Sequence, residues 1–264
     1  MRQFIPFVEK PPLIAVVRLQ GAIGVGARGM SDAGMASAIE RAFGRGKPVA
    51  IALQINSPGG SPTQSALIAA RIRRLADEKN VPVSAFVEDI AASGGYWLAT
   101  AADEIIVDAN SITGSIGVIS ASFGLHEFIG KHGIERRVHA AGQSKSFMDP
   151  FRPEKPEDVE RLGALQKVIH ANFIDQVKAR RGSKLREGVD LFTGDIWVGR
   201  QAVDVGLADA VGHLVPTMKE RFGEKTRFSV HGPKRGLLRR LGAEAMNGVV
   251  GAVEDRAMWA RFGL

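Results

Sequence analysis

Residues 48–62 read Pro-Val-Ala-Ile-Ala-Leu-Gln-Ile-Asn-Ser-Pro-Gly-Gly-Ser-Pro, and this stretch decides the fold. Its apolar run up to Ile55 predicts a buried strand. Ser61-Pro62 predicts the start of a helix, because proline fits the first helical turn. A helical pattern over 61–79 is followed by a second apolar run from Pro82. Two buried strands joined by a helix are typical of a parallel sheet with a right-handed crossover.

The same alternation extends outward from this stretch, from Leu13 to about Gly212. It predicts an α/β fold in which helices flank a parallel β-sheet core. Strands are expected at 13–19, 48–55, 82–87, 104–107, 115–119 and 137–140. Helices are expected at 35–43, 61–79, 93–101 and 154–181, and a short strand followed by a helix and a turn at 195–211.

The composition excludes several classes of protein. The 264 residues contain no cysteine, so disulfide frameworks, thiolate nucleophiles and cysteine-ligated metals are excluded. The formal net charge is +7, and residues 219–240 supply most of it, with eight cationic and two acidic side chains. The rest of the chain is nearly neutral. This distribution argues against a nucleic acid as partner, because a DNA-binding body carries its phosphate contacts over a wide surface.

The charge pattern divides the chain into three parts. We expect an N-terminal extension at 1–12, one domain at 13–218 and a basic amphipathic tail at 219–264. The tail is predicted either to make a peripheral contact with an anionic membrane or to pack on its own domain or a neighbouring subunit. No export signal or membrane-spanning run is seen, which favours a cytoplasmic location, with or without contact with the inner membrane. Apolar residues recur in the tail at helical spacing: Leu238, Leu241, Ala245, Val249 and Val253.

The first of three glycine-rich junctions is Gly59-Gly60, between the predicted strand and helix. Glycines let the backbone turn sharply and approach a ligand, with amide N–H groups free to face it. Neither the lysine of a phosphate-binding loop nor the acidic residue of a dinucleotide site accompanies them. An ordinary strand-to-helix turn is the alternative interpretation.

The second junction places Ser93 after a predicted strand and before two glycines, at the start of a helix. A helix N-terminus offers unpaired N–H groups and a partial positive charge, which favour an alkoxide or an oxyanion. A helix-capping serine is the alternative. The two glycines weaken a helix by about 1 kcal/mol each relative to alanine. Capping does not explain them, whereas close approach by a substrate backbone would.

A serine nucleophile needs a base, and Lys145 is the candidate. It lies among small and apolar neighbours, with no acid closer than Asp149. A lysine is a general base only when neutral, which burial favours; a solvent-facing lysine is the alternative. Ser115, at the head of an expected strand, is suited either to hold a neutral amine or to cap a turn. The six histidines lack a glycine-rich context: His126, His132, His139, His170, His213 and His231.

Four motifs occur in one order: Ser-Pro-Gly-Gly at 57–60, Ala-Ala-Ser-Gly-Gly-Tyr at 91–96, Thr-Gly-Ser-Ile-Gly-Val at 113–118 and Gly-Gln-Ser-Lys-Ser at 142–146. A run from Gly194 to Asp209 follows them. Together they resemble the signal peptide peptidase A family of serine peptidases (peptidase family S49), including its SohB-type members. The resemblance covers about residues 13–212 and implies a ClpP/crotonase-like fold.

The resemblance also implies roles for particular residues. Ser93 would be the nucleophile, Lys145 the general base and Ser115 the group that orients the lysine. The backbone N–H groups of Gly59 and Gly94 would form the oxyanion hole. It implies no cofactor or metal, a short and mostly apolar peptide as substrate, and a homo-oligomer. A crotonase-like acyl-CoA enzyme and a catalytically silent scaffold of the same fold are the alternatives.

Overall fold

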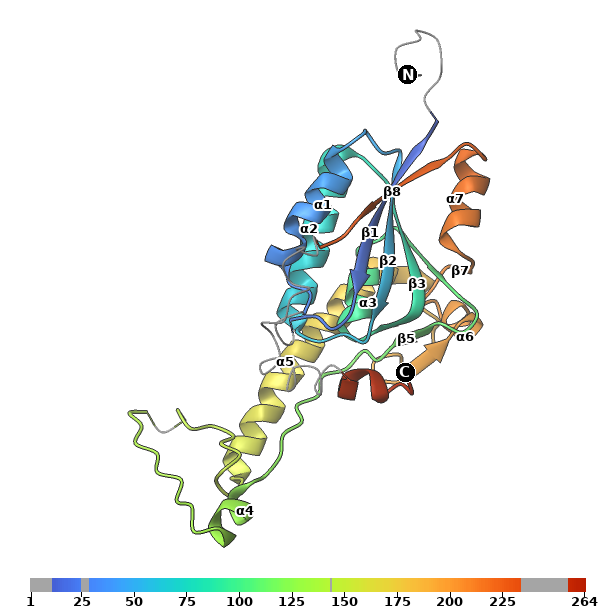
Figure 1. Cartoon of the computed structure of the whole chain (residues 1–264). Helices are drawn as coiled ribbons and strands as arrows, with labels where there is room; N and C mark the ends of the chain where they lie inside the picture. Colours follow the sequence, from blue (N-terminus) through green and yellow to red (C-terminus); the bar gives the residue numbers. More distant parts are fainter. Residues whose placement is uncertain (1–10, 25–28, 143, 234–255) are drawn as a thin grey trace. The chain divides into compact units, whose positions relative to one another are not determined.

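The computed structural model describes residues 11–24, 29–142, 144–233 and 256–264 (Figure 1). The chain divides into two compact units. The first unit contains Met1–Ile116 and Ile174–Leu264, and the second unit contains Gly117–Phe173. The range 13–218, expected as one domain, therefore includes the second unit and part of the first.

A mostly parallel sheet forms the centre of the first unit. Its middle strands are β1 (Leu13–Gln20), β2 (Ala50–Ser57) and β3 (Val83–Ala92). The strand order is β6-β5-β3-β2-β1-β8, and β4 pairs with both β3 and β7. Among the described residues, only the pairing of β5 with β6 is antiparallel. The outer strands are β4 (Glu104–Val107), β5 (Ile112–Gly114), β6 (Ile196–Val198), β7 (Ala210–Val211) and β8 (Arg227–His231).

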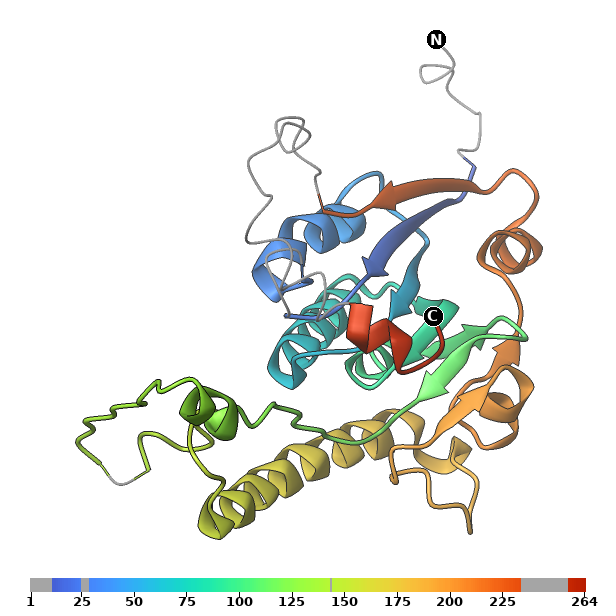
Figure 2. The ribbon, with the colours of Figure 1, turned by 60° about the horizontal axis from the view of Figure 1, so that its bottom comes forward.

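Helices cover this sheet, as the sequence predicted. Helices α1 (Asp32–Gly44) and α2 (Pro62–Lys79) lie together on one side of it, and α7 (Leu214–Phe222) lies on the other (Figures 1 and 2). The predicted α/β fold with a parallel core and flanking helices is confirmed. The other helices are α3 (Gly94–Ala99), α4 (His126–Lys131), α5 (Pro156–Arg181), the short 3-10 helix Gly182–Lys184, and α6 (Arg200–Asp204).

Helix α2 shows how the deciding stretch folds. The Ser61 hydroxyl accepts a hydrogen bond from the Gln64 N–H, and Pro62 occupies the first turn. Asn80 ends the helix in the left-handed conformation, with φ of 50°. The cap at Ser61 and the left-handed Asn80 thus set the two ends of α2, and β3 begins three residues after Asn80.

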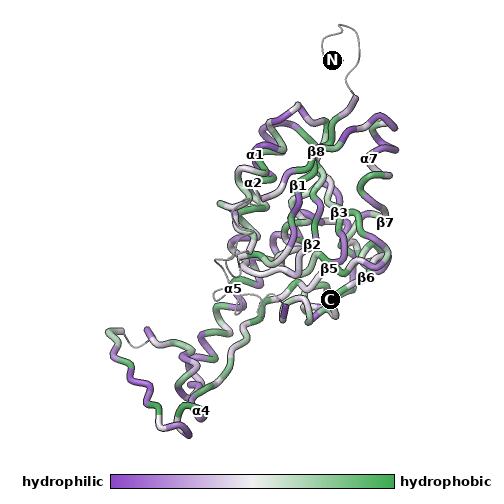
Figure 3. The backbone as a smooth tube through the Cα atoms, viewed as in Figure 1, coloured by the Kyte–Doolittle hydropathy of each residue, from purple (hydrophilic) through white to green (hydrophobic). Residues whose placement is uncertain are grey.

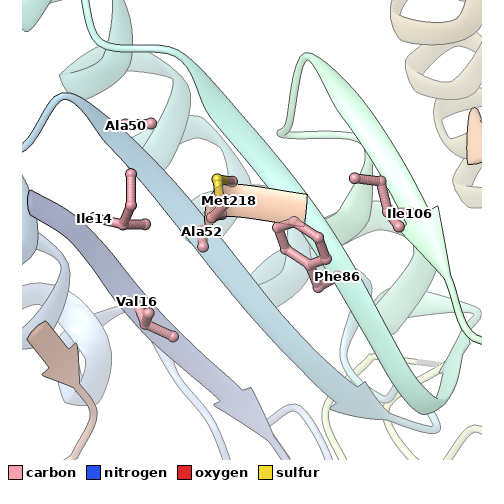
Figure 4. Packing of buried hydrophobic residues seen from close by; sticks show 7 residues of the cluster. All are labelled: Ile14, Val16, Ala50, Ala52, Phe86, Ile106 and Met218. Carbon is pink, nitrogen blue, oxygen red and sulfur yellow. The ribbon is translucent and has the colours of Figure 1, made fainter. Parts of the chain in front are cut away.

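The core lies between β1–β3 and the helices, and the first halves of these strands are mostly apolar (Figure 3). In one hydrophobic cluster, apolar side chains of the sheet pack against Met218 of α7, which is fully buried. Helix α7 therefore belongs to the core of the first unit. Figure 4 shows the members of this cluster: Ile14, Val16, Ala50, Ala52, Phe86, Ile106 and Met218.

The sheet continues past the expected boundary at Met218. Strand β8 pairs in parallel with β1 over five residues, from Leu13 opposite Arg227 to Val17 opposite His231. The boundary between 218 and 219 was placed from charge, and it falls inside α7. The basic segment up to His231 is thus partly an edge strand. The tail helix expected over 238–253 lies outside the described residues.

Two expected strands are corrected. Residues 115–119 do not form a strand; the strand here is β5, which ends at Gly114. Ser115 adopts a φ of 50°, which is incompatible with extended pairing, and the chain then leaves the first unit. Residues 137–140 are also not a strand, because they lie exposed in the second unit without a neighbouring strand to pair with among the described residues.

A buried ion pair joins the end of α5 to the segment before β7. The Arg181 guanidinium binds the Asp209 carboxylate through two hydrogen bonds, of 2.7 and 3.2 Å, and donates a third to the Gly206 carbonyl. Arg181 is 4% exposed. Burial alone raises the pKa of Asp209, but hydrogen bonds from Arg181, Lys184 and the Ile105 N–H outweigh it, so the pKa lies below its ordinary 3.8.

We expect Arg181→Met to lower the free energy of unfolding by about 3 kcal/mol, because it leaves a partly buried carboxylate without its main partner. Urea unfolding at pH 7 measures this effect. The matched control is Arg200→Met, which removes an exposed pair with Asp204 and should change stability by less than about 0.5 kcal/mol. Since the folded pKa of Asp209 is lowered, the contribution of the pair is present above pH 3.8 and is lost as the pH falls through the folded pKa. Equal losses in the two variants at pH 7 would contradict this account.

Candidate active site

Ser93 lies at the sharp turn between β3 and α3. Its φ is 53° and its ψ is −122°, a conformation that side-chain-bearing residues rarely adopt. Its hydroxyl makes no capping hydrogen bond to the helix. The capping interpretation of Ser93 therefore fails, and the backbone strain instead presents a half-buried hydroxyl at the end of the strand. Strained strand-to-helix turns of this kind carry the nucleophile in α/β-hydrolases.

The turn between β2 and α2 lies against Ser93. A Cβ atom built on Gly59 would be 2.8 Å from the Ser93 Cβ and 2.9 Å from both the Ala92 carbonyl and the Gly94 nitrogen. With a φ of 104°, Gly59 also has a backbone conformation that disfavours any side chain. A glycine is required here because two backbone segments meet. The close approach to a ligand that the sequence predicted for this turn stays a prediction.

The N–H groups of this turn have different partners. The Gly59 N–H donates to the Ser57 Oγ at 3.3 Å. The Gly59 carbonyl accepts from the Ile23 N–H at 2.8 Å. Because the peptide bond between Gly59 and Gly60 is trans, its N–H points away from its carbonyl, and thus away from Ile23. Within the described residues, the Gly60 N–H has no acceptor.

Gly94 supplies a second N–H at the same place, and it too has no acceptor in the described part of the chain. It is the first residue of α3, so its N–H has no acceptor inside the helix. The Gly60 nitrogen lies 3.4 Å from the position of a Cβ on Gly94. A side chain on Gly94 would also collide with the Ser65 hydroxyl, and one on Gly95 with the Ser57 carbonyl. The two glycines after Ser93 thus let α3 begin against the β2–α2 turn.

Ser115 leaves the sheet at the same edge as Ser93. Ala92 pairs with Gly114 at the ends of β3 and β5, and the Ser93 N–H donates to the Gly114 carbonyl at 2.8 Å. The Ser115 N–H donates to the Asp195 carbonyl at 2.7 Å, and the residue is 9% exposed. The structure therefore brings together four of the five predicted site residues: Gly59, Ser93, Gly94 and Ser115.

Lys145 belongs to the second unit. It is an exposed residue in a turn, and its N–H donates to the Gly142 carbonyl at 3.2 Å. The nearest acid in the sequence, Asp149, is bound by Arg136 at 3.1 Å. The Asp149 carboxylate is therefore paired with Arg136. The approach of Lys145 to Ser93 stays a prediction.

The sequence is matched by the family described as Peptidase family S49, over residues 76–222. This range is more than half of the chain, and it contains Ser93, Ser115 and Lys145 but not Gly59. The chain belongs to peptidase family S49. The four ordered motifs thus indicated the family correctly.

Several curated proteins are similar to this S49 chain. A Brucella melitensis protein named Na(+)/H(+) antiporter NhaA is 47% identical over 271 residues, which cover 95% of this chain and 37% of that protein. The chloroplastic serine protease SPPA of Arabidopsis thaliana is 32% identical, over 76% of this chain and 31% of that protein. Protease 4 of Haemophilus influenzae is 33% identical, over 76% of this chain and 33% of that protein. The chain thus spans about a third of the length of these relatives.

Two features are absent from the described residues: a helix that could span a membrane and a group of side chains that could hold a metal ion. None of their helices is long and apolar enough to cross a membrane. Their histidine and acidic side chains form no group of three or more in a metal-binding arrangement.

Sequence reasoning missed Ser57 and Ile23 as parts of the site, and the family resemblance gave the oxyanion role in this turn to Gly59 and not to Gly60. Ser57 is the first residue of the Ser-Pro-Gly-Gly motif, but nothing in that motif shows where the Ser57 hydroxyl points. Ile23 comes from the loop after β1, and no sequence pattern links it to Gly60.

Proposed function

We propose that this S49 chain is a serine endopeptidase that hydrolyses peptide bonds of short, mostly apolar peptides with a Ser93–Lys145 dyad. The observation that carries the proposal is the Ser93 turn: a strained, half-buried serine without a capping bond, beside two N–H groups without acceptors in the described residues. The family membership and the relatives named as proteases support it. We also propose a peptide substrate and a homo-oligomeric state.

In the proposed mechanism, the neutral Lys145 amine removes the proton from the Ser93 hydroxyl as the serine oxygen attacks the scissile carbonyl. The protonated lysine then gives its proton to the leaving amine, and a peptidyl ester on Ser93 remains. Water, activated by the same amine, hydrolyses this ester and restores the free serine. Ser115, buried next to the end of β3, would accept a hydrogen bond from the amine and so orient its lone pair.

The oxyanion of the tetrahedral intermediate needs preorganised donors. Gly94 is the first, because its N–H stands free at the start of α3. The family resemblance implies Gly59 as the second donor, and we propose that a backbone N–H of the Gly59–Gly60 turn has this role. Since the Gly59 N–H already donates to Ser57, the Gly60 N–H is the better placed donor of the turn.

The proposed dyad needs Lys145 to leave solvent and meet Ser93. Charge repulsion or burial against an apolar surface would favour the neutral amine. The crotonase-like acyl-CoA alternative does not require a lysine here or a strained serine at 93. The membrane contact proposed for the tail rests on its apolar positions at 238–253, which lie outside the described residues.

A fluorophosphonate probe tests the proposal, because it labels only an activated serine. We expect stoichiometric labelling of the full chain, with the adduct mapped to the peptide that contains Ser93. Ser84→Ala is the control for a buried hydroxyl elsewhere in β3 and should label like the parent. Absence of labelling in a folded, oligomer-competent preparation favours the silent scaffold, and a label at another serine contradicts the assignment of Ser93.

A further inference from the structure

Ser57 is a buried hydroxyl for which the proposed mechanism has no role. Its side chain is fully buried, and its Oγ donates to the Gly21 carbonyl at 2.7 Å while it accepts from the Gly59 N–H at 3.3 Å. On its other side, a Cβ on Gly95 would be 3.2 Å from the Ser57 Cβ. The residue thus contacts the end of β1, the β2–α2 turn and the nucleophile helix α3.

An irregularity in the sheet brings Ser57 to this position. Ile55 pairs with Val87, but Ser57 pairs with Ala91 instead of Asp89, the partner that regular pairing would give it. Between these two pairs β3 has two residues more than β2, so the irregularity is a bulge in β3. Ser57 therefore lies beside the residue two positions before Ser93. Bulges beside active sites commonly re-aim a segment in this way.

The turn after Ser57 is held on two sides. On one side, Ile23 binds the Gly59 carbonyl at 2.8 Å and accepts from the Ser61 N–H at 2.7 Å, through backbone groups only. On the other side, the Ser57 hydroxyl binds the Gly59 N–H. Of these three hydrogen bonds, only the one to the Ser57 hydroxyl involves a side chain. A substitution at Ser57 can therefore remove this hydrogen bond and leave the two backbone hydrogen bonds in place. Rotation of the peptide units at Gly59 would change where the Gly60 N–H points.

We propose that the Ser57 hydroxyl is a positioning group for the oxyanion hole: it holds the Gly59–Gly60 turn so that the free Gly60 N–H faces the oxyanion formed at Ser93. This inference rests on the proposed function. Ser57 does not touch the reacting atoms and acts through the Gly59 N–H and the Gly21 carbonyl. Its contribution is therefore larger in the transition state than in the bound substrate.

The test compares Ser57→Ala with the parent chain on a fluorogenic apolar peptide. We expect kcat to fall about 10- to 100-fold, less than the roughly 10²- to 10³-fold lost when an oxyanion-hole donor is removed outright. KM should stay within about twofold. The inhibition constant of a peptide aldehyde, whose adduct with serine carries the oxyanion, should rise by the same factor as kcat falls, whereas that of a non-covalent product peptide should not change.

Ser84→Ala is the matched control, because Ser84 is another buried β-strand serine whose hydroxyl donates a hydrogen bond, to Glu104. A purely structural role for Ser57 predicts that both variants lose melting temperature and keep the parent kcat and aldehyde affinity. That result overturns the inference. A fall in kcat with unchanged aldehyde affinity also overturns it, because the defect would then lie outside the oxyanion hole.

A second pair of variants serves if Ser57→Ala does not fold. Ser57→Thr and Ser57→Val have nearly the same shape and differ in the hydroxyl. We expect Ser57→Thr to keep a kcat at least tenfold above that of Ser57→Val, and equal kcat values overturn the inference. Ser93→Ala, assayed beside them, separates the two hypotheses: activity in Ser93→Ala contradicts the proposed function, whereas an inactive Ser93→Ala with a fully active Ser57→Ala contradicts only the positioning role.

Discussion

Ser93→Ala is expected to abolish peptide hydrolysis, with a fall in kcat on the order of 10⁴- to 10⁶-fold. The reason is that the hydroxyl supplies the attacking oxygen, and neither the N–H groups of Gly60 and Gly94 nor the rest of the site can replace it. Alanine removes that oxygen without adding volume, and it meets the same backbone strain at a φ of 53°. The measurement is steady-state hydrolysis of a fluorogenic peptide by protein purified away from host proteases.

The fold of Ser93→Ala should be unchanged, because the Ser93 hydroxyl makes no capping hydrogen bond that the substitution would remove. Melting temperatures of the parent, Ser93→Ala and the control Ser84→Ala establish this. Hydrolysis by Ser93→Ala at the parent rate would show that another residue is the nucleophile. A large loss of melting temperature would show instead that the serine has a structural role.

Lys145→Arg is expected to be nearly as inactive as Lys145→Ala, with kcat at least 10²- to 10⁴-fold below the parent, the usual contribution of a general base. Arginine keeps the positive charge but has no accessible neutral form, so it cannot accept the serine proton. A lysine that only binds substrate or stabilises a loop would tolerate arginine. Kinetics of both variants on the same peptide distinguish these roles.

Two further measurements support the assignment of Lys145. Ser115→Ala should weaken the activity without removing it, because Ser115 is proposed to orient the amine and not to replace it. Lys155→Arg, another exposed lysine of the second unit, is the matched control and should keep the parent rate. A Lys145→Arg variant with more than a tenth of the parent kcat would contradict the dyad.

Much of the architecture follows from local sequence. The apolar runs that became β1, β2, β3 and β4 were predicted because a strand buried on both faces has to be apolar throughout. Helix α2 was predicted with its start, since Ser61 and Pro62 act on their own first turn. Local rules failed for Ser115, where a three-residue strand comes before the serine and not after it, because short apolar runs do not show their own pairing. They failed also for β8, whose pairing partner lies over 200 residues away.

The sequence by itself determined the family and the parallel α/β core, and it predicted Ser93, with the two glycines after it, as the nucleophile. These depend on residue type and on neighbours within a few positions. Only the tertiary structure decided that Gly59, Gly94 and Ser115 meet at Ser93 and that Ile23 holds the Gly59–Gly60 turn. It also decided that the Gly59 N–H donates to Ser57, whereas the Gly60 N–H has no acceptor among the residues described. Each of these facts depends on strand register and on the direction of a peptide group. A register shift of two residues leaves the sequence pattern unchanged but moves a hydrogen-bond donor by several ångströms.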